Sequence, residues 1–201
     1  MNKSVILSIQ PRFCSSIFSG QKTVEVRKTK PRIPTPFKCY IYCTQCSPYN
    51  PAIPYNYKTG TSKYSTEHST FFTSHVIGEF ICDEVKQLDL DSVGVGFYED
   101  DKFIYLSEYN DWDEKLTRQE FWDYSRGKRV YGWHISNLII YDTPKQVNDF
   151  KRVCPNELYC ESCAMFSEYS QSCGNAALTL KRPPQSWCYV SDKKRTKEET
   201  I

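Results

Sequence analysis

Three charged side chains, Lys22, Glu25 and Arg27, follow closely after Gly20. Residues two apart in a strand face the same way, so Glu25 and Arg27 share one face of a strand predicted over 23–28. A lysine and an arginine placed this way can bind phosphate, and the carboxylate can orient them or accept a hydrogen bond from a base or ribose. The alternative is a solvated strand face held by an ordinary ion pair.

Ten cysteines are the second possible source of chemistry. Cys160 and Cys163 have the spacing at which two thiolates reach one tetrahedral Zn²⁺ from a turn, and Cys154 and Cys173 can complete the set. The surrounding segment, residues 151–180, is loop-like and has little apolar content, so it needs a metal to hold it together. We therefore predict one structural zinc ion, with reduced thiols or disulfides as the alternatives.

The other cysteines and the histidines give weaker signals. Cys43 and Cys46 have the same spacing, but only His68 and His75 lie near them in the sequence, so metal binding is not favoured there. The remaining cysteines fall in predicted helices or strands and are expected to be buried like small apolar residues: Cys14, Cys39, Cys82 and Cys188. The sequence contains no Ser-His-Asp order, no phosphate loop and no HExxH motif.

Composition indicates a strand-rich globular protein. The 201 residues suit one domain with additions, aromatic residues make up 15%, and the net charge is only +2. The charge is uneven, because residues 22–32 carry five cations and one acid, whereas residues 83–114 carry eleven acids and two lysines. The basic segment is a candidate phosphate-binding patch, and the acidic segment is expected to be a solvated loop or a docking surface for a protein.

The start of the chain and the lengths of its apolar runs indicate the cellular compartment in which the protein is expected. Only five mostly apolar residues follow Met1 to Ser4, too few for a secretory signal, and no apolar run has the length of a membrane span. We therefore expect a cytoplasmic protein with no membrane partner. A reducing compartment argues against a disulfide framework of the ten cysteines.

Short strands and two helices are expected to position these residues. An apolar run predicts a first strand over 5–9, and a proline begins a helix predicted over 11–19. A second helix is predicted over 117–126, where a capping-box pattern begins it. Further elements are expected in this order: strands over 23–28, 37–44, 72–88 and 131–141, and a short helical piece over 144–150. The predicted core includes Val24, Val26, Phe80, Phe121, Ile135 and Leu138.

Two stretches interrupt this pattern. Residues 45–70 have no helical or strand period and are predicted to be an inserted loop, and residues 89–116 an acidic segment with a turn at Gly94 and Gly96. The predicted organisation is a main domain over 1–150, the Cys-rich segment over 151–180, a closing strand within 181–191 and a disordered charged tail over 192–201.

The chain resembles the ASCH domain family. The family motif G-x-K-x-x-E-x-R is matched by Gly20, Lys22, Glu25 and Arg27. Further similarity follows in the family's order, so the resemblance runs over residues 1–145: Val5 to Ile9, Val76 to Phe80, Phe121 to Tyr124 and Gly132 to Leu138. The resemblance implies an α+β fold, with a PUA-like mixed β-barrel flanked by short helices and a small Cys-rich insertion, and a function associated with RNA and modified nucleosides.

Three functions are compatible with this resemblance. The first is binding of RNA or a nucleotide in a cleft around the motif residues, with a base stacked on one of three aromatic rings: Tyr40, Tyr42 or Trp133. The second is hydrolysis of a modified nucleoside, or of RNA, by Lys22 and Glu25. Similar amidohydrolases use the motif lysine with a threonine, and this chain has Glu25 at the threonine's position. The third is a protein-interaction module.

The zinc prediction can be tested by elemental analysis, which should find about one zinc ion per chain in freshly purified protein, with Zn–S distances near 2.3 Å. Cys160→Ser should loosen residues 151–180 and leave the rest of the chain folded. Absence of zinc, with the four thiols far apart, would contradict the prediction.

Overall fold

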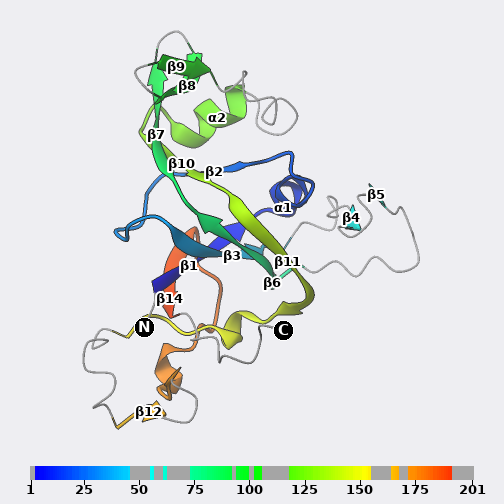
Figure 1. Ribbon diagram of the computed structural model, residues 1–201, viewed down its shortest axis with the longest axis vertical. Helices are drawn as coiled ribbons and strands as arrows, with labels where there is room; N and C mark the ends of the chain where they lie inside the picture. The colour runs from blue at the N-terminus through cyan, green and yellow to red at the C-terminus, as the bar shows by residue number, and fades with distance from the viewer. Residues whose placement is uncertain are drawn as a thin grey trace.

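The structure is a computed structural model and describes residues 3–45, 55–56, 61–62, 73–91, 94–99, 102–105, 118–154, 164–167 and 172–191. Within these ranges the chain forms two five-stranded sheets, two short strand pairs and two α-helices (Figure 1). The expectation of a strand-rich α+β chain is confirmed at this level. The described strands belong to two separate sheets, so closure into a barrel stays a prediction.

The first sheet is mixed. Its strands, in spatial order, are β11 (Ser136–Lys145), β6 (His75–Cys82), β3 (Phe37–Cys43), β1 (Lys3–Ile9) and β14 (Trp187–Ser191). β1 and β3 run parallel, and the other neighbours are antiparallel. Val5, Ile6 and Leu7 in β1 are fully buried although successive side chains point to opposite faces. Burial of both faces explains why this strand is a continuous apolar run rather than an alternating one.

The second sheet is antiparallel throughout. Its strands, in spatial order, are β2 (Val24–Arg27), β10 (Val130–His134), β7 (Val85–Asp91), β8 (Gly94–Glu99) and β9 (Lys102–Tyr105). Gly94 and Gly96, predicted to mark a turn, both lie in β8 and pair with β7: Gly94 is the first residue of that strand, directly after the connection from β7, and Gly96 lies inside it. The acidic segment therefore contains strands that extend the second sheet.

Two predicted strands are divided where the chain passes from one sheet to the other. The strand predicted over 72–88 becomes β6 and β7, with residues 83–84 between them, and the strand predicted over 131–141 becomes β10 and β11. A 3.0 Å backbone hydrogen bond from His134 to Glu84 joins the two breaks. The acidic residues at the first break are exposed, which favours ending a buried strand there.

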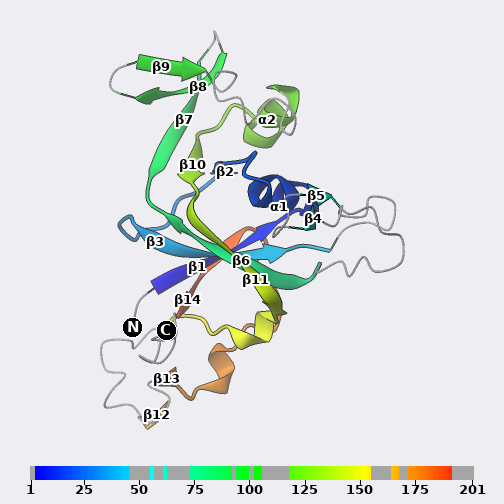
Figure 2. The same cartoon turned by 45° about the vertical axis from the view of Figure 1, so that its right-hand side comes forward.

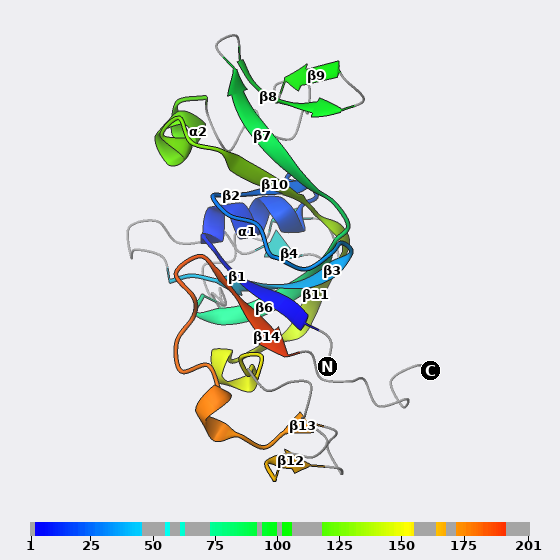
Figure 3. The same cartoon turned by 90° about the vertical axis from the view of Figure 1, so that its left-hand side faces the viewer.

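Both predicted helices are confirmed to within one residue at each end. α1 (Pro11–Phe18) begins with a proline and lies between the two sheets (Figures 2 and 3). α2 (Arg118–Ser125) lies at one end of the second sheet and is followed by Arg126 and Gly127, both with positive φ, the usual conformation just after a helix. The short helical piece expected over 144–150 is a 3₁₀ helix at Val147–Asp149.

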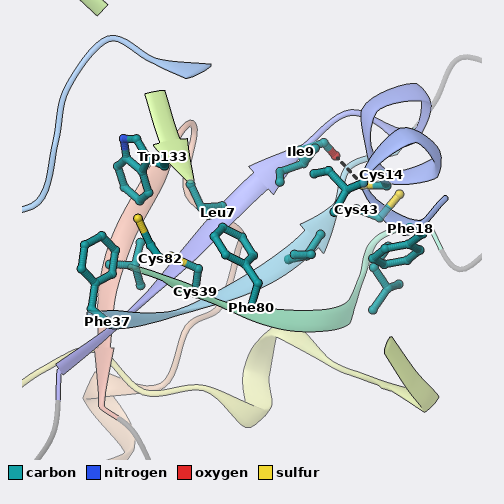
Figure 4. Packing of buried hydrophobic residues seen from close by; sticks show 14 residues of the cluster. Leu7, Ile9, Cys14, Phe18, Phe37, Cys39, Cys43, Phe80, Cys82 and Trp133 are labelled. Atoms are coloured by element: carbon teal, nitrogen blue, oxygen red, sulfur yellow. Dashed lines mark hydrogen bonds between the residues drawn. The ribbon is translucent and has the colours of Figure 1, made fainter. Parts of the chain in front are cut away.

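Two hydrophobic clusters pack on opposite faces of the first sheet. The larger one contains the odd-numbered residues of β3 together with Phe80, α1 and Trp133, and Figure 4 shows its side chains. The smaller one contains even-numbered residues of β3, with Phe150, Leu180 and Val190. Of the predicted core residues, Val26 and Phe80 are buried, whereas Val24, Ile135 and Leu138 are half-buried.

The predicted loop and the Cys-rich segment each contain a short strand pair. β4 (Tyr55–Asn56) pairs with β5 (Thr61–Ser62), and β12 (Phe166–Ser167) pairs with β13 (Ser172–Cys173), which a 3₁₀ helix at Ala176–Leu178 follows. The side chain of Phe121 and residues 192–201 lie outside the described part. No described helix is long and apolar enough to cross a membrane.

Replacing either of two glycines in the sheets by alanine should lower the stability of the fold, but by different amounts. A Cβ at Gly78, which pairs with both β3 and β11, would lie 2.6 Å from the backbone oxygen of Ile139. Because backbone cannot move aside, we expect Gly78→Ala to lower the free energy of unfolding by about 1–3 kcal/mol in chemical denaturation.

Gly132→Ala is the matched control for this prediction. A Cβ at Gly132 would meet the Cγ1 methyl of Val24 at 2.9 Å, and a side chain can shift where backbone cannot. We expect a smaller loss of stability in this variant, and equal losses in the two variants would contradict the explanation.

Candidate functional site

Both faces of β2 are largely buried, whereas the prediction buried only the face of Val24 and Val26. Glu25 and Arg27 share a face with their cross-strand partners Trp133 and Tyr131, both of which pack in the larger hydrophobic cluster. The exposed fractions of Glu25 and Arg27 are only 6% and 7%. The polar face of β2 therefore points toward the core, and a solvated strand face is excluded. Val24, expected to face the core, contacts Gly132 on the opposite side of the second sheet.

The motif residues form a continuous row of charges. Lys22 Nζ lies 3.2 Å from Glu25 Oε2, and Glu25 Oε1 lies 3.1 Å from Arg27 Nη2. Lys22 also donates a 2.6 Å hydrogen bond to the carbonyl of Val24 and lies over the ring of Phe13 at 5.5 Å. The structure thus brings together the three motif side chains that sequence spacing had placed near one another. We call them the Lys22–Glu25–Arg27 row.

Arg27 joins the two sheets. Its Nη2 donates a 2.9 Å hydrogen bond to the carbonyl of Ser8 in β1, and its Nη1 donates longer bonds of 3.4 Å to the carbonyl and hydroxyl oxygens of Ser186. Ser8 and Ser186 are themselves joined by a backbone hydrogen bond of 2.9 Å. Both serines lie far from the motif in the sequence, which offers no signal for either as an Arg27 partner.

Three buried polar atoms on this face lack a hydrogen-bond partner among the described residues. They are Glu25 Oε2, Arg27 Nε and the indole Nε1 of Trp133. Glu25 Oε2 has Lys22 nearby as an ion pair, without hydrogen-bond geometry. Buried polar atoms without partners are rare in native structures, so three on neighbouring residues require an explanation.

The aromatic residues expected to stack on a base are all buried. Trp133 is fully buried and packs edge-on against Phe37 and Trp187, with centroid distances of 5.6 and 5.8 Å. Its ring has no face open for stacking, which corrects that expectation. Tyr40 and Tyr42 belong to the smaller cluster on the other face of the first sheet, away from the row.

Gly20 and Tyr124 border this region in different ways. Gly20 is exposed, has a φ of +75°, and follows α1, so a left-handed turn requires glycine there. Burial raises the pKa of Tyr124 in α2, with Arg27 opposing and Glu25 reinforcing the shift. Tyr124 is thus a neighbour of the row that sequence reasoning missed, although it ends the aromatic stretch of the predicted second helix.

The described cysteines behave as core residues. Cys14, Cys39 and Cys82 are buried, and burial raises the pKa of each thiol, that of Cys82 to about 12. A hydrogen bond from Cys14 lowers the pKa of Cys43. Cys188 is half-buried. Burial also raises the pKa of Cys188. A raised pKa disfavours the thiolate, so Cys14, Cys39, Cys82 and Cys188 are poor nucleophiles.

The predicted zinc site falls partly outside the described residues. Cys160 and Cys163 lie outside, whereas Cys154 is half-buried and Cys173 buried. Within the ranges that the structure describes, no three His, Cys, Asp or Glu side chains are grouped to hold a metal ion. Zinc binding therefore stays a prediction.

The second cysteine pair is similarly placed. Cys46 and His68 are outside the described residues, whereas Cys43 in β3 is the cross-strand partner of His75 in β6. Both ring nitrogens of His75 have contacts, with the carbonyl of Thr73 at 2.9 Å and with Gln146 at 2.6 Å. This histidine is held within the fold.

Comparison with known proteins gave matches only among solved structures. No protein-family model and no curated protein matches the chain. The chain is similar to the crystal structure of ASCH from Zymomonas mobilis, with 19% identity and a TM-score of 0.45, over 94% of this chain and 87% of that chain. Two mutant forms of the Zymomonas mobilis protein have the same identity and TM-score, with 91% and 89% of their chains covered. These structures bear the name of the domain that the motif resembles.

The contacts of Arg27 predict that it is needed for stability. Arg27→Ala removes the bonds to Ser8 and Ser186 and leaves Glu25 buried beside one cation instead of two. Breaking one side of a buried ion pair typically costs about 3–5 kcal/mol, and we expect a loss of that order in denaturant unfolding.

Two variants provide the comparison. Lys28→Ala, at the next and exposed position, should change the free energy of unfolding by less than about 0.5 kcal/mol. Glu25→Leu combined with Arg27→Leu removes both charges and should cost less than Arg27→Ala alone. An Arg27→Ala protein as stable as Lys28→Ala would contradict a structural role for Arg27.

Proposed function

We propose that the protein binds RNA or a nucleotide, with a base recognised at the Lys22–Glu25–Arg27 row. The observation that carries the proposal is a set of buried atoms without hydrogen bonds: two N–H donors, on Arg27 and Trp133, and one carboxylate oxygen, on Glu25. The partner of that oxygen is the ion pair with Lys22. Cross-strand pairing of Trp133 with Glu25 places these side chains next to one another on one face of the sheet. The motif resemblance supports the same class of ligand.

The chemistry of the three atoms is complementary to the edge of a nucleobase. Arg and Trp side-chain nitrogens can only donate hydrogen bonds, and an ionised carboxylate can only accept them. A nucleobase presents carbonyl acceptors and N–H donors side by side on its edge, which single-stranded RNA leaves available to a protein. A carbonyl oxygen would accept from Arg27 and Trp133, and an adjacent N–H would donate to Glu25.

Access to the row is through Lys22. This side chain has an exposed fraction of 8% and covers Glu25, at the side where α1 ends and the exposed Gly20 follows. A ligand reaching Glu25 has to displace the Lys22 ammonium, which can then pair with a phosphate instead. Gly20 has no Cβ, so the chain next to Lys22 leaves room for that approach.

The competing account is that the row serves only to join the sheets. Arg27 alone cannot separate the two accounts, because its loss is expected to unfold or weaken the protein. Trp133 offers a cleaner test, since replacing its ring by phenylalanine removes the unpartnered N–H and keeps most of the packing.

We expect Trp133→Phe to weaken binding of a single-stranded RNA, measured by fluorescence polarisation, about fivefold to tenfold, as befits one lost hydrogen bond. Trp187→Phe is the matched control, because the Trp187 indole already donates a 3.0 Å bond to Thr29 and contacts Trp133 edge-on. That variant should bind RNA as the unaltered protein does. Lys22→Ala should also weaken binding while the protein remains folded.

The outcomes distinguish ligand binding from a purely structural role. Unaltered affinity in folded Trp133→Phe and Lys22→Ala proteins would mean that the row is structural and its unpartnered atoms bind only water. Absence of any affinity of the unaltered protein for RNA or mononucleotides would end the proposal.

A further inference from the structure

Two exposed basic segments, distant in sequence, lie beside each other outside the row. The first, residues 28–32, directly follows β2, and the second, residues 126–129, directly precedes β10. Their six cations are all exposed: Lys28, Lys30, Arg32, Arg126, Lys128 and Arg129. Neither segment contains an acidic residue. We call their combined side chains the basic surface.

Strand pairing brings the two segments together. β2 and β10 are antiparallel, and their ladder ends with Arg27 opposite Tyr131, so the chain leaving β2 starts beside the chain that enters β10. Lys28 Nζ lies 4.9 Å from the ring centre of Tyr124, at the end of α2, and Lys30 Nζ lies 5.6 Å from that of Tyr131. These rings restrict the positions of Lys28 and Lys30, while the ammonium groups of the two lysines remain in solvent.

The basic surface also has an aromatic and concave component. Trp122 in α2 is 53% exposed, and a hollow of about 430 Å³ lies beside it, lined by Trp122, Asp123, Arg126 and Gly127. Asp123 is the acidic residue of this hollow, and it moderates the positive charge without cancelling it. Exposed rings beside several cations are the usual components of surfaces that bind single-stranded nucleic acid.

The interior row cannot supply the long-range attraction for such a ligand. Lys22 and Arg27 are buried and share Glu25, which neutralises half of their charge. The basic surface has six exposed cations, and its first segment begins directly after Arg27. A strand lying on the basic surface would therefore pass next to the end of the row.

We propose that the basic surface binds the phosphate backbone of single-stranded RNA, while a base farther along that strand enters the Lys22–Glu25–Arg27 row from its Lys22 end. The inference rests on the proposed function and adds where the strand lies and which residues neutralise its phosphates. Both segments contact the backbone on the Arg27 side of the recognised base, because both lie beyond that end of β2. The contacting residues are Lys28, Lys30 and Arg32 in the first segment and Arg126, Lys128 and Arg129 in the second. Trp122 stacks on a neighbouring base.

Salt dependence of binding tests the proposal directly. The probe is a fluorescently labelled single-stranded RNA of mixed sequence and roughly 20 nucleotides, longer than the usual site of one small binding domain. Each phosphate contact with a single strand contributes about 0.7 to the slope of log K against log salt. Changing Lys28, Lys30 and Arg32 together to Gln should reduce the slope by about 2 and weaken binding on the order of tenfold or more at 0.1 M salt. The same change at Arg126, Lys128 and Arg129 should do likewise.

A matched control removes the same charge elsewhere. Arg152, Lys181 and Arg182 are exposed and belong to segments that bridge to β14 or flank the buried Leu180, away from β2 and β10. Their triple change to Gln should leave the slope almost unchanged. Trp122→Ala should weaken binding by roughly tenfold without changing the slope, because stacking releases no counterions.

Each outcome bears on one proposal or on both. If the unaltered protein binds RNA and all three triple variants lose affinity equally, the basic surface is overturned and the proposed function stands. If a DNA strand or a polyglutamate peptide binds more tightly than the RNA, the assignment to RNA is overturned. If the unaltered protein binds no RNA, both proposals fail together.

Discussion

The ion pair between Glu25 and Arg27 is the interaction on which the rest of the arrangement depends. Burying two charges is costly unless each finds close partners. Here Glu25 lies between two cations, and Arg27 donates to a main-chain carbonyl in β1 and to Ser186, which precedes β14. One guanidinium thereby ties the edge strand of the second sheet to two strands of the first, and its planar fork of donors suits that task better than a lysine would.

In the proposed function, the same row combines a structural with a recognition role. A purely structural clasp would satisfy all of its polar atoms, yet a donor on Arg27, a donor on Trp133 and an acceptor on Glu25 remain without a hydrogen bond among the described residues. Such atoms are rare in native structures and call for an explanation, such as strain, a bound water or ion, or a functional role. Because Glu25 is shared by two cations in a buried site, the row is suited to reading a polar edge more than to attracting a charged strand.

In the two proposals, attraction of the RNA strand and recognition of its base are accordingly divided between two places. The basic surface gathers six exposed cations from two segments, and the buried row offers a small set of oriented donors and one acceptor. Exposed charges act over about a Debye length and lose strength in salt, whereas buried hydrogen bonds act only at contact and are little screened. This division predicts that the affinity for RNA falls as the salt concentration rises. The preference for one base over another should not change with salt.

The sequence alone determined the elements and the motif, and the tertiary structure decided which faces they present. Helix and strand periodicity placed both helices and most strands because these patterns are local. Val24 and Val26 indicated one buried face of β2, and Val26 is buried, but Arg27 also found partners in Ser8 and Ser186, so the opposite face is buried as well. The sequence of residues 126–129 did not indicate that they form a basic surface with residues 28–32. Only the pairing of β2 with β10 places the two segments beside each other. Such contacts join positions far apart in the chain, so they depend on the whole fold rather than on any local pattern.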